Sequence, residues 1–184
     1  LDVQTRADTR AMLRRTLAGV GGARVLVTHD PVDALTLADR LLILESGRVV
    51  QSGTPDEIVA HPRSAYVADL VGVNLYRGRA EGDVVHIDGA RLTVVEPLRG
   101  PVLAIIAPHS VFVYRAQPSG SARNVWAGTV VAVDRLGSRV RVRIDGALPI
   151  VAEVTPAAVE ALDLRPGTGV WAAVKATDIV VFAD

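Results

Sequence analysis

Cysteine is absent from this chain of 184 residues, and aromatic side chains make up 4% of it. A chain without cysteine has neither a disulfide framework nor a thiolate metal site. Histidine is present, but the four residues do not have the spacing of metal ligands, so we expect no metal site: they are His29, His61, His86 and His109. With 49% hydrophobic residues, the chain has ample material for a folded core.

A net charge is also missing, because 20 Lys and Arg residues balance 20 Asp and Glu residues. Anion binding therefore has to be local, and the composition gives no reason to expect nucleic acid as a partner. No apolar run approaches the roughly 18 residues of a membrane span, and no secretory leader is recognisable. The sequence predicts a soluble intracellular protein. Because it starts at Leu1 inside structured sequence, we expect a fragment or a processed piece.

The first 71 residues have the pattern of an α/β unit. An amphipathic helix should end at the glycine cluster 19–22, and residues 24–28 form an apolar run typical of a parallel strand covered on both faces. His29 would lie at the carboxyl end of that strand, where open α/β sheets bind ligands. The further elements expected are a helix opened by Asp30-Pro31, a hairpin over 41–51, a capping-box helix over 54–60 and a helix over 64–70.

A series of short motifs in this unit occurs in the order found in importer-type ABC transporter ATPases. The motifs are Leu1-Asp2-Val3, 25–30, Ala38-Asp39-Arg40, 47–50 and 53–58. Residues 1–71 therefore resemble the C-terminal part of such an ATPase domain. The resemblance implies that Asp2 ends the dimer-interface loop and that His29 is the switch histidine at the γ-phosphate, a role that suits an imidazole. The alternative is a strand-end histidine that merely caps the next helix.

Most of the machinery for ATP hydrolysis is absent from this sequence. It has no G-x-x-x-x-G-K-[ST] P-loop, no signature segment and no apolar strand ending in Asp-Glu before Leu1. Phosphoryl transfer depends on the P-loop and its Mg²⁺, which position and neutralise the phosphates. We therefore expect this chain alone to be inactive as an ATPase, and ATP with Mg²⁺ to bind the full-length protein only.

From Gly72 onward, short alternating strands with glycine turns predict an all-β region of small-barrel type. This region also contains an internal repeat. Residues 74–78 echo 124–128, and residues 102–114 align without gaps on 170–182. We expect two copies of one β-unit, over 72–118 and 119–184, with a turn-rich seam between them.

The second unit differs from the first at two places. It alone has Ser121-Ala122-Arg123 before the shared asparagine Asn124, and it alone has Lys175-Ala176-Thr177 where the first unit has Ala107-Pro108-His109. Lys175 is also the single lysine in a chain that otherwise uses arginine. Such a bias suggests a position where a compact ammonium is needed and a planar guanidinium would not fit.

These two segments have the chemistry that a tetrahedral dianion such as molybdate or sulfate requires. Backbone N–H groups, small hydroxyls and a point charge supply short hydrogen bonds and a countercharge, and small side chains let the main chain approach. Lys175 would be the charge, and Arg123 a second donor or a structural brace. The small residues of the site are Ser121, Ala122, Ala176 and Thr177. The alternative is that residues 121–124 are simply the turn that enters a strand.

A second resemblance is carried by residues 121–124, 128–131, 152–155, 162–167 and 174–177. They resemble a molybdate-binding Mop (molbindin-type) domain, which also follows the ATPase domain of molybdate importers as an OB-like (oligonucleotide/oligosaccharide-binding) barrel. The whole chain thus resembles the C-terminal portion of such a subunit, an α/β remnant of an ABC ATPase domain followed by an all-β, OB-like TOBE/Mop barrel built from two repeated units.

This second resemblance also implies a ligand, partners and a location. The ligand would be molybdate or tungstate, bound at sites that lie between subunits. The complete subunit would be a homodimer beneath integral-membrane permease subunits, peripheral on the cytoplasmic face of the cell membrane.

Other functions stay open. Arg139, Arg141 and Arg143 alternate with apolar residues and could line a nucleic-acid groove, but aromatic stacking platforms are scarce, so we favour a solvated strand face. The chain could also be a stand-alone oxyanion-binding module without ATPase coupling. A further possibility is the regulatory barrel of an importer for another solute, such as sulfate, a sugar or a polyamine.

Overall fold

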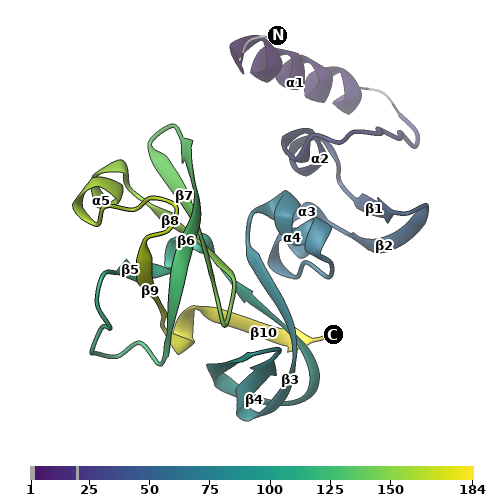
Figure 1. Ribbon diagram of the computed structural model, residues 1–184. Helices are drawn as coiled ribbons and strands as arrows, with labels where there is room; N and C mark the ends of the chain where they lie inside the picture. Colours follow the sequence, from purple (N-terminus) through teal and green to yellow (C-terminus); the bar gives the residue numbers. More distant parts are fainter. Residues whose placement is uncertain (1–2, 20) are drawn as a thin grey trace. The chain divides into compact units, whose positions relative to one another are not determined.

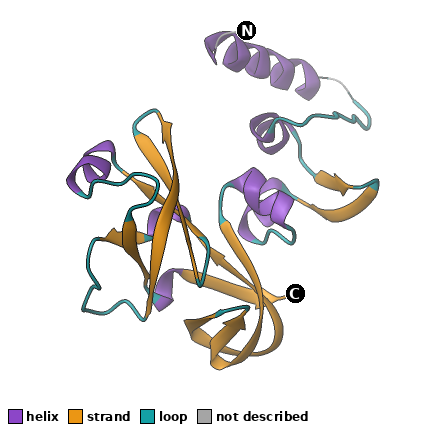
Figure 2. Cartoon of the chain, viewed as in Figure 1, coloured by secondary structure: helices purple, strands orange, loops and turns teal. Residues whose placement is uncertain are grey.

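The computed structural model describes residues 3–19 and 21–184. The chain divides into two compact units at the junction of Val71 and Gly72, and each unit is described by itself. Helices predominate in the first unit and strands in the second, as the colours of Figure 2 show.

The first unit consists of helices and one hairpin (Figure 1). The helices are α1 (Val3–Ala18), α2 (Pro31–Leu37), α3 (Pro55–Ala60) and α4 (Ala65–Val71), and the hairpin joins β1 (Leu41–Glu45) to β2 (Arg48–Gly53). A small apolar core contains Leu41 and Ile43 from the hairpin, Ile58 from α3 and Val67 from α4. These helices and the hairpin match the ranges expected from the sequence.

Local side-chain chemistry explains where two of these helices begin. The carboxylate of Asp30 accepts hydrogen bonds from the N–H groups of Val32 and Asp33, at 2.8 and 3.2 Å, and so caps α2. The Thr54 hydroxyl accepts from the Glu57 N–H, and the Glu57 carboxylate accepts from the Thr54 N–H, which makes the expected capping box of α3. A proline follows each cap at the first helical position, where its missing N–H is tolerated.

Residues 24–28 do not form the predicted strand. They have no regular secondary structure, and Val25 and Val27 are each 91% exposed. A parallel strand covered on both faces needs hydrogen-bonded neighbours. In the described part of the first unit, β1 and β2 pair with each other and with no further strand, so the apolar run has nothing to pair with. The prediction of a buried parallel strand is therefore wrong for these residues. Asp2 lies outside the described residues.

The second unit is built mainly from antiparallel strands. They are β3 (Asn74–Ile87), β4 (Ala90–Ile106), β5 (Phe112–Tyr114), β6 (Asn124–Leu136), β7 (Arg139–Gly146), β8 (Ile150–Val154), β9 (Gly169–Val174) and β10 (Ile179–Ala183). The short helices are η1 (Pro108–Ser110), α5 (Pro156–Ala161) and η2 (Ala176–Asp178). The hydroxyl of Thr155 caps α5 by accepting from the Ala158 N–H at 3.2 Å, as expected.

The strands of this unit form two sheets, and each sheet combines strands from the earlier and the later part of the unit. One has the order β10-β4-β3, and the other has the order β5-β9-β6-β7-β8. The last strand of the chain pairs with β4 through Ile179 and Ile106, while the short strand β5 pairs with β9 through Phe112 and Ala173. Neither sheet is therefore confined to residues 72–118 or to residues 119–184.

One apolar core joins these two sheets. Leu92 and Ile106 enter it from β4, and Val130, Val142 and Val174 enter it from β6, β7 and β9, all of them fully buried. Burying a side chain of this size contributes about 1.5–3 kcal/mol. The shared core explains why residues 72–184 form a single compact unit.

Polar contacts also fix the start of β3 against the start of β8. The Nδ2 of buried Asn74 donates to the carbonyl oxygens of Ile106 and Val151. In return, the Val151 N–H donates to the Oδ1 of Asn74 at 2.7 Å. Two residues along β3, the Tyr76 hydroxyl donates to the carbonyl oxygen of Pro149 at 2.8 Å. Strands β3 and β8 are therefore held by side-chain hydrogen bonds although they share no ladder.

Candidate functional site

The two segments predicted to bind an oxyanion leave the five-stranded sheet at the same end. Strand β6 begins at Asn124 and β9 ends at Val174, and these two residues are register partners. The loop 121–123 runs into Asn124, and the turn 175–177 follows Val174. Antiparallel pairing thus brings together two segments that are distant in the sequence.

The turn 175–177 is shaped by the short helix η2. Lys175 precedes this helix with an extended backbone, and its carbonyl oxygen accepts from the Asp178 N–H at 3.0 Å. The Thr177 hydroxyl donates to the Asp178 carboxylate, also at 3.0 Å. Thr177 would therefore have to release Asp178 before its hydroxyl hydrogen could be donated to an anion.

The polar side chains of the two segments are available to a ligand. Ser121, Arg123 and Lys175 are exposed, and their side chains have no hydrogen-bond or ion-pair partner among the described residues. Ala122 and Ala176 are half-buried. One end of the β6–β9 pair therefore presents an ammonium, a guanidinium and a hydroxyl that no other side chain engages.

Asn124, by contrast, has a structural role. It is 2% exposed, its Oδ1 accepts from the Thr93 N–H at 2.7 Å, and its Nδ2 donates to the Thr93 carbonyl oxygen at 2.9 Å. Both polar atoms of the side chain are thus engaged by the main chain of β4. Asn124 fixes the loop 121–123 against a strand of the other sheet, and a ligand would meet its neighbours rather than its amide.

A polar groove of about 580 Å³ lies beside Arg123 and Asn124. Its remaining lining comes from the β3–β4 hairpin and from β6, namely Val84, Gly89, Ala90, Arg91, Thr93, Val125 and Trp126. Arg91 is exposed, and no described residue pairs with its side chain. Two unpaired guanidinium groups therefore line one groove. Sequence reasoning missed Arg91 because this contact depends on how β4 packs against β6, and no local motif marks it.

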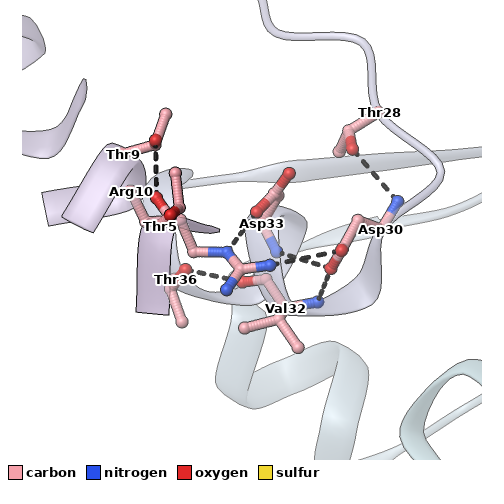
Figure 3. A network of polar contacts seen from close by, with 8 residues as sticks. All are labelled: Thr5, Thr9, Arg10, Thr28, Asp30, Val32, Asp33 and Thr36. Atoms are coloured by element: carbon pink, nitrogen blue, oxygen red, sulfur yellow. Dashed lines mark hydrogen bonds and ion pairs between the residues drawn. The ribbon is translucent and has the colours of Figure 1, made fainter. Parts of the chain in front are cut away.

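His29, the other predicted functional residue, is exposed in the first unit between Thr28 and Asp30. The Asp30 N–H donates to the Thr28 hydroxyl at 3.0 Å, and the Asp30 carboxylate accepts from Arg10 Nη2 at 3.2 Å (Figure 3). Arg10 also donates from Nε to Asp33, and this hydrogen bond raises the pKa of the Arg10 guanidinium. The network holds α1 against the start of α2. It does not involve the imidazole, so the role of His29 stays a prediction.

The described residues contain neither a cluster of metal ligands nor a helix that could span a membrane. Within residues 3–19 and 21–184, no group of three or more His, Asp or Glu side chains is placed to hold a metal ion. The helices of the same ranges are too short or too polar for one of them to cross a bilayer.

Comparisons with known proteins place the candidate site inside a characterised domain. The family model of the TOBE domain matches residues 120–181, a range that contains both the loop 121–123 and the turn 175–177.

Curated relatives extend the similarity to nearly the whole chain. The molybdenum import ATP-binding protein ModC of Mycobacterium tuberculosis is 38% identical, over 98% of this chain and 52% of the relative. The molybdate/tungstate import ATP-binding protein WtpC of Pyrococcus horikoshii is 31% identical over 99% and 53%. The sulfate/thiosulfate import ATP-binding protein CysA of Burkholderia pseudomallei is 36% identical over 78% and 41%. The chain thus spans about half the length, or less, of these relatives.

A solved structure supports the fold of the second unit. The cytoplasmic molybdate-binding protein ModG, determined with molybdate bound, is similar with a TM-score of 0.52 and 26% sequence identity, over 60% of this chain and 96% of that chain. Together with the TOBE match, this similarity indicates an OB-like β-barrel.

Proposed function

Because the chain corresponds to the C-terminal portion of the ATP-binding subunits of molybdate-type ABC importers, we propose that it is the oxyanion-binding, regulatory part of such a subunit. The observation that carries this proposal is the meeting of the loop 121–123 with the turn 175–177 at one end of the β6–β9 pair, inside the TOBE range. ModG, whose structure contains molybdate, supports molybdate as the ligand.

The proposed site binds its ligand chiefly by charge and by main-chain donors. Lys175 supplies the countercharge of a tetrahedral dianion, and Ser121 donates from its hydroxyl. The small residues Ala122 and Ala176 let backbone N–H groups approach. Arg123 and Arg91 raise the positive potential beside the site, since no carboxylate of the described chain neutralises them. Thr177 joins the site once its hydroxyl leaves Asp178.

We further propose that the barrel consists of two copies of one β-unit, 72–118 and 119–184. The strand registers support this. Asn74 is opposite Ile106 and Asn124 is opposite Val174, at corresponding positions of the repeat. In the same way Gly78 is opposite Val102, and Gly128 is opposite Val170. The last strand of each copy, β5 or β10, then completes the sheet of the other copy.

The activity of the complete protein is a proposal of a different kind, since the chain spans about half of its relatives. In that protein, ATP and Mg²⁺ bind a P-loop outside the sequence described here, and His29 acts as the switch histidine at the γ-phosphate. Asp2 belongs to the dimer-interface loop of a homodimer. The subunit lies peripherally on the cytoplasmic face of the membrane, against permease subunits. The barrel binds intracellular oxyanion, and this binding regulates the ATPase.

Sulfate is a second candidate ligand, because CysA of Burkholderia pseudomallei, a sulfate/thiosulfate import ATP-binding protein, is 36% identical over most of this chain. Sulfate and molybdate are tetrahedral dianions, so the same donors and the same charge serve both. A stand-alone oxyanion-binding module and a purely structural barrel make different predictions. The first binds anions without any upstream ATPase, and the second binds none.

Calorimetric titration of this chain tests the proposed site. We expect one molybdate ion to bind at each site formed by the loop 121–123 and the turn 175–177, and equimolar sulfate should not displace it. Lys175→Ala should weaken the binding of molybdate at least tenfold. Arg79→Ala is the matched control, because Arg79 is an exposed cation outside the proposed site and its side chain has no described partner. Displacement by sulfate would favour the sulfate importer. If a folded sample gives no heat of binding with either anion, the alternative of a purely structural barrel would be favoured.

A further inference from the structure

The polar groove beside the loop 121–123 is larger than a tetrahedral oxyanion requires. Its volume of about 580 Å³ lies within the range of about 300–1,000 Å³ that is usual for sites of organic ligands. Molybdate or sulfate, each a single central atom with its oxygen atoms, would leave most of this space empty. The groove is therefore a candidate site for a larger ligand than the one proposed for Lys175.

Three side chains of the groove present hydrogen-bond donors that no described residue engages. Arg91 and Arg123 are exposed, and neither has a hydrogen-bond or ion-pair partner in the described chain. The indole N–H of Trp126 has no described partner either, and it is not among the buried unpaired groups, so it stays accessible. Arginine and tryptophan side chains donate hydrogen bonds and do not accept them. The groove therefore suits a ligand that is rich in acceptor oxygen atoms.

The positive charge of the two arginines is available to a ligand. The residues that line the groove include no Asp or Glu. Asp88, in the turn of the β3–β4 hairpin, forms no ion pair with either arginine among the described residues. His86 is opposite Arg91 in the same hairpin, and its ion pair is with Glu81 at 3.8 Å. An anion in the groove would therefore meet two guanidinium groups that no carboxylate already binds.

The repeat shows that the equivalent aromatic side chain is used differently. In the alignment of 74–78 with 124–128, Tyr76 corresponds to Trp126. The Tyr76 hydroxyl donates to the carbonyl oxygen of Pro149 at 2.8 Å, so the polar atom of that side chain is occupied within the fold. Val73, which precedes Asn74 as Arg123 precedes Asn124, brings no charge. The cationic groove with a free N–H group is thus a feature of the second repeat.

We propose that this groove binds a small molecule that carries a diphosphate group, with Arg91 and Arg123 on the phosphates and the Trp126 N–H as a further donor. A planar guanidinium binds phosphate oxygen atoms through paired hydrogen bonds, so two of them match two linked phosphates. Inorganic diphosphate and a nucleoside diphosphate share this chemistry. The inference goes beyond the function proposed above, because it does not require an oxyanion at Lys175.

Tryptophan fluorescence tests the groove directly, because Trp126 and Trp171 are the two tryptophans of the chain. In Trp171→Phe, Trp126 is the only reporter. We expect sodium diphosphate and ADP, in buffer without Mg²⁺, to change its emission saturably. The sequence has no P-loop, so ADP cannot be held there. Equal affinity for the two ligands would identify the diphosphate itself as the recognised group, and tighter binding of ADP would identify the nucleoside as a further part of the ligand.

Two further anions set the limits of the proposal. AMP carries a single phosphate, and citrate carries several carboxylates, so each lacks the linked phosphates. At matched ionic strength both should leave the emission of Trp126 unchanged at concentrations that saturate with diphosphate. Equal binding of AMP or citrate, or no saturable response to diphosphate and ADP, would overturn the proposal.

Calorimetry of two arginine variants keeps the test independent of the fluorescent reporter. Arg91→Gln and Arg123→Gln should each weaken the binding of diphosphate about tenfold or more, because each loses charge-assisted hydrogen bonds. Arg79→Gln removes an exposed cation outside the groove and should change it less than about twofold, since salt screens such a charge. Thermal unfolding shows whether each variant is folded. If both folded variants bind diphosphate as the wild type does, the assignment of the groove is wrong.

Lys175→Ala separates this inference from the function proposed for the barrel. It should weaken the binding of molybdate and leave the response of Trp126 to diphosphate in place. Unchanged binding of molybdate in Lys175→Ala would contradict the proposed oxyanion site alone. Loss of the diphosphate response in a folded Lys175→Ala sample would contradict the groove as a separate site.

Discussion

Asn74 and Asn124 hold distant strands together with the same pair of hydrogen bonds. Asn74 exchanges a donor and an acceptor with the main chain of Val151, and Asn124 does so with the main chain of Thr93, at 2.7 and 2.9 Å in both cases. Among the described residues these are the two buried polar side chains. Each side-chain amide therefore pairs with a strand as the main chain of a neighbouring strand residue would. It joins two sheets that have no ladder between them.

Truncating Asn124 should destabilise the second unit. Asn124→Ala leaves the half-buried N–H and carbonyl of Thr93 without these partners, which costs about 1–3 kcal/mol in the free energy of unfolding. Urea denaturation followed by tryptophan fluorescence measures this change. Gln117→Ala removes an exposed amide that has no described partner and should change stability by less than about 0.5 kcal/mol. Equal stability of the two variants would mean that the amide pair is dispensable.

A methyl group at Gly128 should also destabilise the barrel. A Cβ there would lie 2.5 Å from Ile144 Cγ2 and 2.7 Å from the Asp145 carbonyl oxygen, so β6 and β7 would have to separate. We expect Gly128→Ala to cost about 1–3 kcal/mol, as other overpacking substitutions do. The control is Gly169→Ala, where nothing lies within 4 Å of the added atom. A loss of the same size in both variants would show that the steric clash is not the cause, since the backbone entropy of the unfolded chain changes in the direction that favours folding.

Tyr76 should make stability depend on alkaline pH. Burial raises the pKa of its hydroxyl above the ordinary value of 10.0. Below that pH the hydroxyl is protonated in both states, and its contribution is constant. Above it the unfolded chain ionises first and binds fewer protons than the folded chain, so the free energy of unfolding falls as pH rises.

Tyr76→Phe separates the two contributions of this side chain. At neutral pH it should cost about 0.5–1.5 kcal/mol, because the hydrogen bond to Pro149 is lost. In alkaline solution the variant should lose less stability than the wild type. Urea denaturation at about pH 8 and about pH 11 measures both effects, with Tyr114→Phe on the exposed edge strand as control. Identical pH dependence in wild type and Tyr76→Phe would refute this assignment.

Arg91 should assist anion binding through its charge. It shares the groove with Arg123 and has no carboxylate partner in the described chain. We expect Arg91→Gln to weaken molybdate binding about three- to tenfold at low salt, and much less at about 0.5 M salt, where screening acts over a few ångströms. Titrations at the two salt concentrations measure this. An effect that is the same at both concentrations would indicate direct contact or altered folding instead of long-range attraction.

Elements encoded by neighbouring residues could be predicted from the sequence. The caps at Asp30, Thr54 and Thr155 lie next to the helices that they begin, and all three occur as expected. Residues 24–28 show the opposite case. Their apolar composition predicts a buried strand, but a strand forms only when another pairs with it, and no described strand of the first unit does so.

The sequence motifs of the candidate site could be recognised in advance, but the residues that surround the site could not. Ser121 and Lys175 stand out because the second repeat differs from the first there, and the register of β6 and β9 brings their segments to one end of the sheet. Arg91 could not be found in this way. Its place beside Arg123 depends on how distant strands pack, and such packing leaves no local signal in the sequence.

Locating the bound anion tests the central claim most directly. Molybdenum scatters X-rays anomalously, so crystals of this chain grown with molybdate identify the ligand by its own signal. We predict an anomalous peak beside Ser121 and Lys175, with oxygen atoms of the anion within hydrogen-bonding distance of both side chains, either in one chain or between two, and its loss in Lys175→Ala. Peaks confined to other surfaces, or an unchanged peak in Lys175→Ala, would contradict the assignment of the loop 121–123 and the turn 175–177 as the oxyanion site.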